Sequence, residues 1–285
     1  HLLLVEKGRI QFTYKMVLEH FLESKSVNQN VCLTFLIGFF YTILSFILSK
    51  LFFPNSLSIS MIFLLTIFLI PSSLKLINSL EKLDAKDGVK KFFKNHGTLF
   101  KLYLCLFIGI FLCFIILSNV DSSIFDYQTS ILKMKGDISD NGRIIMASSD
   151  FSLSKSLAIT SQNIMVIVVA FLLSIFYGVG GLFLIILNAS VFAAYVVTLL
   201  GVSSKTYSLV SLISIHMIPE IFGFFIATLA GALISRAIFK EKLGSNEFQN
   251  VIRDSLILLF MSALIILIAG MLEIMVVARL IVHLL

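Results

Sequence analysis

Charged residues are scarce in this chain of 285 residues, since Asp, Glu, Lys and Arg together make up only 13% of it. Soluble domains carry about 25%. Hydrophobic residues reach 58%, and the mean hydropathy is +1.02. Several apolar runs are as long as the roughly 20 residues that cross a bilayer as a helix. Because these runs are continuous rather than alternating, a barrel is disfavoured, and an all-α polytopic transmembrane helix bundle is predicted.

Tryptophan is absent, and only three cysteines occur. Any aromatic belt at the membrane surface must therefore consist of Tyr and Phe. The spacing of Cys32, Cys105 and Cys113 matches no zinc or redox pattern, so these residues are expected to behave as small hydrophobic side chains. The net charge of +6 requires no nucleic-acid partner, because the basic residues cluster beside the apolar runs.

Common catalytic signatures are missing as well. The glycines of YGVGG at 177–181 are followed by LFLII, without the Lys or Ser/Thr that would hold a phosphate. No GxSxG nucleophile motif occurs. The apolar part of the opening HLLLVEKGRI is too short for a signal-peptide core, so no cleavable signal is expected. The protein is expected not to be an enzyme.

The apolar runs predict seven spans. They lie at about 31–50, 57–77, 99–118, 157–176, 181–200, 208–237 and 255–283. Residues 2–25 have apolar side chains at helical spacing and are predicted to form an amphipathic helix, either on the membrane surface or packed on a cytoplasmic loop. The chain divides into an N-terminal part, 1–95, with two spans and a basic segment, and a core, 96–285, with the polar loop 119–156.

The distribution of Lys and Arg predicts the orientation. With the N-terminus inside, the inner segments carry 15 of these residues and the outer segments 6. The protein is therefore expected in the cell membrane as a multi-pass protein with a cytoplasmic N-terminus. The segment 78–98 would lie inside and the loop 119–156 outside. A re-entrant bend at 177–181, in place of a turn, would invert every later assignment.

Five polar residues lie inside the predicted spans and need a physical reason, because such groups are costly in hydrocarbon. They are Asn163, Asn188, His216, Glu220 and Glu273. At 1.5 Å per residue, their depths are similar enough that we expect them to converge in one layer of the bundle. His216 and Glu220 share a helix face because they are four residues apart.

Three interpretations of this layer remain open. Its members could hydrogen-bond the helices together, bind a proton or ion, or hold a metal through His216, Glu220 and Glu273. The HExxH pattern is absent, because Met217 occupies the position of its catalytic Glu. We expect no cofactor, with Zn or another divalent metal as the alternative.

Helix bends and close helix contacts are also predicted. Pro219 frees a backbone carbonyl and bends its helix, and the glycines of the 177–181 segment mark a second bend. Those glycines are Gly178, Gly180 and Gly181. Gly223, Ala227 and Gly231 recur every four residues, which predicts a close helix contact within the chain or between subunits. Phe225 is expected to face lipid or a looser contact.

These residues carry a resemblance to a known family. Residues about 95–285 resemble the stage II sporulation protein M family of integral membrane proteins. The matching segments are SQNIMVIVV, YGVGGLF, ILNAS, HMIPEIFGFFIATLAG and AGMLEIM, which contain the five polar residues. Ala189 and Met217 stand where the family usually has Gly. The resemblance implies that the first two spans and the N-terminal helix are an addition to the family core.

The resemblance implies a non-enzymatic membrane anchor, which in sporulating bacteria holds peptidoglycan-degrading partners during engulfment. The leading hypothesis is therefore an integral membrane scaffold or assembly factor for a membrane or cell-envelope complex. A component of an ion- or proton-coupled transporter is the first alternative, and a metal-dependent intramembrane hydrolase is the second. The expected partners are membrane lipids and either a protein partner or further copies of the chain, with no nucleic acid.

Overall fold

The computed structural model of the chain describes residues 31–71, 92–135, 153–177, 180–201, 206–242 and 244–273. The elements are α2 (Val31–Phe52), the short 3-10 turn η2 (Pro54–Ser56), a helix over 57–71, α4 (Phe92–Leu117), η4 (Ser122–Phe125), α5 (Asp126–Lys135), α6 (Leu153–Tyr177), α7 (Leu182–Leu200), α8 (Thr206–Lys240) and α9 (Asn246–Leu272). No strand occurs in these ranges. The predicted all-α fold is confirmed.

The spans agree broadly with the sequence prediction. Within the described residues, six helical stretches are long and apolar enough to cross a membrane, and Lys101–Leu117 of α4 is a shorter apolar helix. The amphipathic segment 2–25, the basic residues 78–91 and the end of the last predicted span, 274–283, lie outside the described residues. The multi-pass membrane architecture is therefore supported, while the orientation remains a prediction.

The last helix begins earlier than its hydropathy predicted. α9 starts at Asn246 rather than near 255. Ser245 caps it, since its hydroxyl oxygen accepts a hydrogen bond from the backbone N–H of Phe248 at 3.2 Å. The cap stabilises a polar first part of the helix, which a search for apolar residues does not detect.

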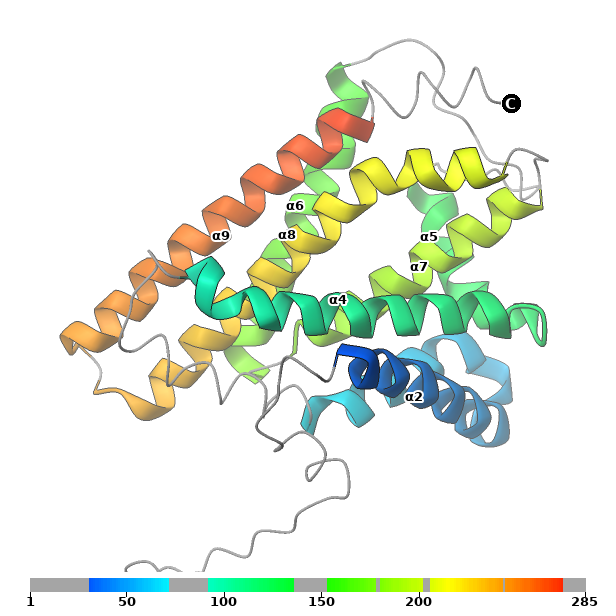
Figure 1. The fold of residues 1–285 in the computed structure, drawn as a ribbon, viewed down its shortest axis with the longest axis horizontal. Coiled ribbons are helices and arrows are strands. Elements are labelled where there is room, and N and C mark those ends of the chain that lie inside the picture. The colour runs from blue at the N-terminus through cyan, green and yellow to red at the C-terminus, as the bar shows by residue number, and fades with distance from the viewer. Residues whose placement is uncertain are drawn as a thin grey trace, which may run out of the picture.

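α8 lies at the centre of the bundle, and α6 and α9 pack along it (Figure 1). Residues 221–235 are buried except for the half-buried Phe222. Phe225 lies against α4, with its ring centroid 5.6 Å from that of Tyr103 and 6.3 Å from that of Phe107. Only 3% of Phe225 is exposed, so the expectation that it faces lipid is wrong. A helix enclosed on all sides has no lipid-facing stripe.

α2 and α4 cross at two glycines. A Cβ atom at Gly109 would collide with the carbonyl oxygen of Phe35, and one at Gly38 would lie 2.7 Å from the carbonyl oxygen of Leu106. Lys50, near the end of α2, lies with its Nζ atom 2.9 Å from Oδ2 of Asp121, which follows the end of α4. The two helices therefore run in parallel, and their C-terminal ends lie on the same side of the bundle.

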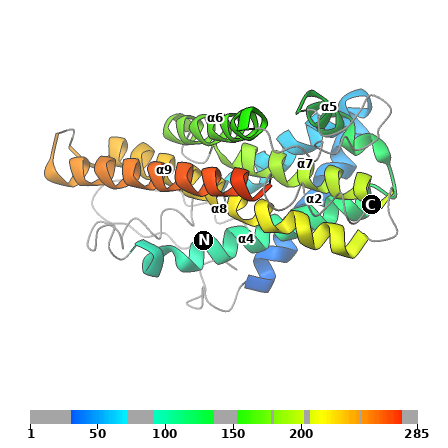
Figure 2. The ribbon, with the colours of Figure 1, turned by 90° about the horizontal axis from the view of Figure 1, so that it is seen from above.

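The helix over 57–71 joins this pair to the core. The ring centroids of Phe63 and Phe183 are 5.0 Å apart, and Ile70 packs against Ala232 of α8. Figure 2 shows α2 and α5 at one end of the molecule, with the hairpin of α8 and α9 extending at the other. The N-terminal helices thus pack on α4 and α7 and touch α8 at Ala232.

The first part of the predicted loop 119–156 is helical. η4 and α5 pack on α7, and Ile124, Phe125 and Leu132 are buried there. Residues 136–152 lie outside the described residues. The segment that follows α4 is therefore part of the packed bundle over at least 122–135.

Candidate functional site

The centre of the candidate site is a hydrogen bond between α6 and α8. Asn163 Nδ2 donates to Glu220 Oε1 at 2.7 Å. Both side chains are buried, each with 5% of its surface exposed. A buried carboxylate or carboxyl group needs a polar partner. This hydrogen bond therefore stabilises Glu220 inside the bundle and links α6 to α8.

His216 lies on α8 one turn before Glu220. It is 9% exposed, and among the described residues its Nδ1 atom has no hydrogen-bond partner. Pro219 lies inside α8 and cannot donate to the carbonyl of Ile215. Figure 1 shows α8 changing direction along its yellow part. The polar residues of α8 therefore lie beside a helix segment with a freed backbone acceptor.

The small residues of α8 form close contacts with α9 and α6. A Cβ atom at Gly223 would lie 2.8 Å from Ile266 Cδ1, and Ser262 Oγ donates to the Gly223 carbonyl oxygen at 2.8 Å. A Cβ atom at Gly231 would collide with the carbonyl oxygen of Phe171 on α6. Ala227, between them, is fully buried. This seam of small residues joins helices of one chain, which resolves the alternative left open by the sequence.

Two separate helices flank the YGVGG segment, whose described glycines Gly180 and Gly181 lie in a turn. α6 ends at Tyr177 and α7 begins at Leu182. The Gly181 N–H donates to Ser174 Oγ at 3.0 Å, and a Cβ atom at Gly181 would lie 2.7 Å from Thr228 Oγ1. Gly180 lies against the carbonyl oxygen of Leu173 in the same way, whereas Gly178 lies outside the described residues. The glycines allow this turn to pack on α8.

The other two predicted members of the polar layer have different surroundings. Asn188 Nδ2 donates to the carbonyl oxygen of Leu184 at 2.9 Å, within α7. Glu273 follows the last turn of α9 and is half-buried. One turn before it, Gly270 packs against Thr160 of α6. The structure therefore joins Asn163 to Glu220, and convergence of all five residues stays a prediction.

Other buried polar residues were missed from the sequence, and Gln128 is one of them. Gln128 of α5 is fully buried. Its Oε1 accepts from Ser58 Oγ at 2.6 Å, and its Nε2 donates to Ser190 Oγ at 3.0 Å. The spacing of Ile124, Gln128 and Leu132 could have indicated that Gln128 is buried, since residues four apart share one face of a helix. Gln128 connects the N-terminal helices, α5 and α7.

Among the described residues outside the spans, one titratable group has a clearly shifted pKa. The pKa of the Asp121 carboxyl is lowered from 3.8 to about 2, first by the hydrogen bond from Lys50 and then by those from Ser123. In the described part of the chain, no three His, Cys, Asp or Glu side chains lie close enough together to hold a metal ion. The possible metal ligands His216, Glu220 and Glu273 are not brought together as such a group.

The fold and these contacts define a multi-pass helical membrane protein with buried polar groups between its helices. The family model for stage II sporulation protein M matches residues 102–277. The chain therefore belongs to the stage II sporulation protein M family, as the resemblance implied. Comparisons with curated protein sequences and with solved structures gave no match. The matched region contains the five polar residues and leaves α2 and the helix over 57–71 outside it.

Proposed function

We propose that the protein is a non-enzymatic membrane scaffold, which holds partners of a membrane or cell-envelope complex. The observation that carries this proposal is the use of the buried polar groups. Asn163 bonds to Glu220, and Ser262 bonds to the backbone at Gly223. Each of these contacts links α8 to a neighbouring helix. Polar groups used in this way stabilise a fixed arrangement of helices, which is what a scaffold needs.

The enclosed position of α8 supports the same proposal. Fourteen of the fifteen residues from 221 to 235 are buried, and the seam of small residues brings backbones into direct contact. Alternating access in transporters requires bundles that rock against each other. A glycine whose Cβ would collide with a neighbouring backbone leaves little room for such motion. The geometry therefore favours a rigid core.

The test is isolation of the complex from native membranes. The tagged chain is crosslinked in intact cells, purified in a mild detergent, and its co-isolated proteins are quantified by mass spectrometry. An unrelated tagged multi-pass protein is the control. We expect defined envelope proteins in fixed ratio to the chain, and the same set with Glu220→Gln, because an amide oxygen can still accept from Asn163. A chain that is recovered alone would contradict the scaffold.

A proton- or ion-coupled transporter component is the second candidate. The observation in its favour is His216, which is buried with an Nδ1 atom that lacks a partner among the described residues. Ionisable residues inside spans often mark proton or ion paths. The purified chain in liposomes, under an imposed pH gradient, tests this function. Flux that Glu220→Gln and His216→Phe both abolish would favour the transporter, and absence of flux would favour the scaffold.

A further inference from the structure

Several aromatic side chains project from the ends of the apolar helices without packing against the described bundle. Phe52 and Phe53, at the end of α2, are 65% and 48% exposed. Phe176 and Tyr177, at the end of α6, are each 74% exposed, and Phe239, near the end of α8, is 85% exposed. Large exposed apolar groups need an apolar partner. Because all five exposed rings lie at helix ends, we expect them to contact the same kind of surroundings.

The five rings lie at two opposite ends of the bundle. Phe52 and Phe53 lie where α2 and α4 both end, close to the Lys50–Asp121 ion pair. Figure 1 shows α8 starting at the end of the molecule where α4 finishes and running to the other end, where α9 begins. Phe239 is therefore at the opposite end from Phe52 and Phe53.

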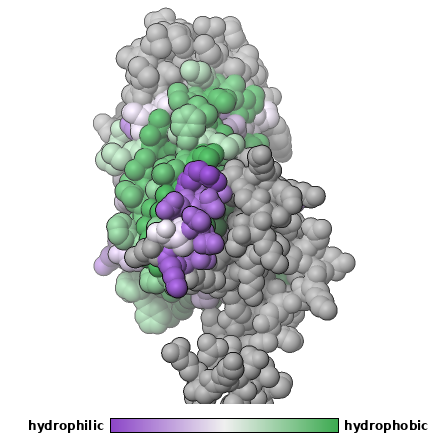
Figure 3. Space-filling model, turned by 90° about the vertical axis from the view of Figure 1, so that its left-hand side faces the viewer, coloured by the Kyte–Doolittle hydropathy of each residue, from purple (hydrophilic) through white to green (hydrophobic). Residues whose placement is uncertain are grey.

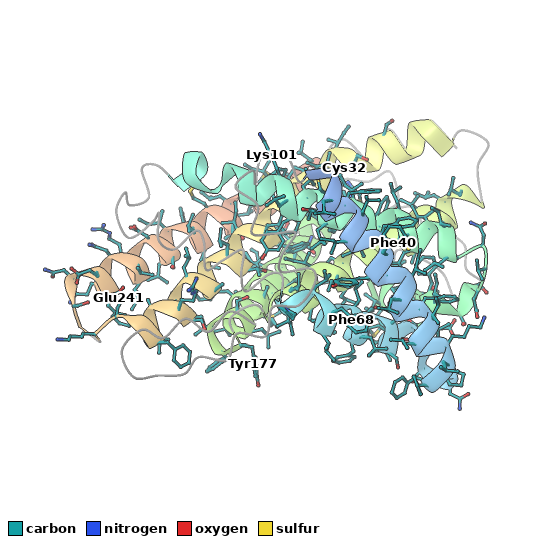
Figure 4. All side chains as sticks on the ribbon, turned by 60° about the horizontal axis from the view of Figure 1, so that its bottom comes forward. Cys32, Phe40, Phe68, Lys101, Tyr177 and Glu241 are labelled. Atoms are coloured by element: carbon teal, nitrogen blue, oxygen red, sulfur yellow. The ribbon has the colours of Figure 1, made fainter. Side chains whose placement is uncertain are left out.

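Phe176 and Tyr177 belong with Phe239. α6 runs parallel to α8. Asn163 of α6 contacts Glu220 of α8, and Ser174, further toward the end of α6, contacts Gly231, which is further toward the end of α8 by the same number of residues. The C-terminal ends of the two helices thus lie on the same side. Figure 4 labels Tyr177 at the end of α6 and Glu241 at the far end of the α8–α9 hairpin.

Charged residues lie close in sequence to Phe52 and Phe53 at one end and to Phe239 at the other. Lys50 precedes Phe52, and its Nζ lies 5.5 Å from the ring centroid of Phe46. After Phe239 come Glu241 and Lys242, and Glu247 is exposed at the start of α9. Figure 3 shows a hydrophilic patch beside a hydrophobic flank on this side of the molecule. On the hairpin side, the apolar flank is followed by the ring of Phe239 and then by charged residues, which is the order met on leaving a bilayer.

We infer that these five rings occupy the boundary between lipid headgroups and acyl chains, as two aromatic belts made without tryptophan. The occupant of these exposed surfaces is the lipid interface. The tip of the hairpin, from Glu241 to Glu247, then projects into water. Exposed rings in the middle of spans, such as Phe40 and Phe260 at 60% and 65%, face the acyl chains. This inference does not depend on the scaffold proposal.

The absence of Trp makes the test clean, since each introduced Trp is the only one in the chain. The full chain carrying Phe53→Trp, Tyr177→Trp or Phe239→Trp is reconstituted in liposomes. Two sets of liposomes contain lipids brominated either near the headgroup or near the chain end. A third measurement uses acrylamide, which quenches from water. Phe260→Trp is the control for the acyl region, and Glu247→Trp is the control for water.

The belt residues should be quenched most by lipid brominated near the headgroup. Phe260→Trp should be quenched most by lipid brominated near the chain end, and Glu247→Trp only by acrylamide. Acrylamide quenching of any belt variant to the level of Glu247→Trp, without quenching by brominated lipid, would overturn the assignment of that belt. Gel filtration of each variant before reconstitution confirms that the fold is retained.

Discussion

Gly231 offers the sharpest test of the packing between α6 and α8. A methyl group at this position would collide with the carbonyl oxygen of Phe171 and lie 2.7 Å from Ser174 Cβ. Backbone cannot move aside as a flexible side chain can, so Gly231→Ala should push the helices apart. Overpacking of this kind costs about 1–3 kcal/mol. The higher helix propensity of Ala offsets about 0.5–1 kcal/mol of this loss of stability.

We therefore expect Gly231→Ala to lower the free energy of unfolding by about 1 kcal/mol or more. Gly231→Leu should prevent stable folding. Gly201→Ala is the matched control, because a Cβ atom there would meet only the carbonyl oxygens of Thr198 and Val197, at 3.5 and 4.0 Å. The control should stay within about 0.5 kcal/mol of the wild type. The measurement is reversible unfolding in mixed micelles. Equal stability of the two alanine variants would refute the close contact.

Three further predictions concern the periphery of the bundle. Gln128→Leu leaves the hydroxyls of Ser58 and Ser190 without their partner and should cost about 1–3 kcal/mol in the same unfolding assay; the exposed Ser130→Leu on the same helix should cost far less, and equal losses would count against the Gln128 contacts. The pKa of Asp121 is lower in the folded chain, so the ion pair with Lys50 stabilises the fold above pH 3.8 and this stabilisation is lost as the pH falls toward about 2. The loss, under about 1 kcal/mol for an exposed pair, should be absent in Asp121→Asn. The same dependence of stability on pH in the wild type and in this variant would contradict the prediction. Single cysteines in a cysteine-free chain should be labelled in intact cells at Ser130 but not at Lys86, and the reverse pattern would invert the predicted orientation.

The helices could be predicted from the sequence because each apolar run is long and continuous. The small-residue seam followed from the same local information, since Gly223, Ala227 and Gly231 are spaced at four residues. Counting residues put Asn163 and Glu220 at similar depths, and the structure shows them hydrogen-bonded. The sequence alone could not show which polar residues are direct partners, because the contact joins α6 and α8, whose partner residues are far apart in sequence.

Two errors have the same physical origin. Phe225 was expected to face lipid or a looser contact, yet it is buried against α4, because an enclosed helix carries no periodic signal that distinguishes its neighbours. Gln128 was assigned to a loop, because its partners Ser58 and Ser190 lie on helices distant in sequence. Local patterns report whether a residue is apolar or polar. They do not report what surrounds it when several helices meet.

The central claim is that the buried polar contact between α6 and α8 is structural. Glu220→Gln, introduced into the chain in its native membrane, tests this most directly when folding and complex formation are measured together. The account predicts normal amounts of folded protein and an unchanged set of crosslinked partners, because the amide still accepts the hydrogen bond from Asn163. Normal folding with loss of the complex, or of proton or ion flux, would show that Glu220 is needed for its charge and would contradict the account.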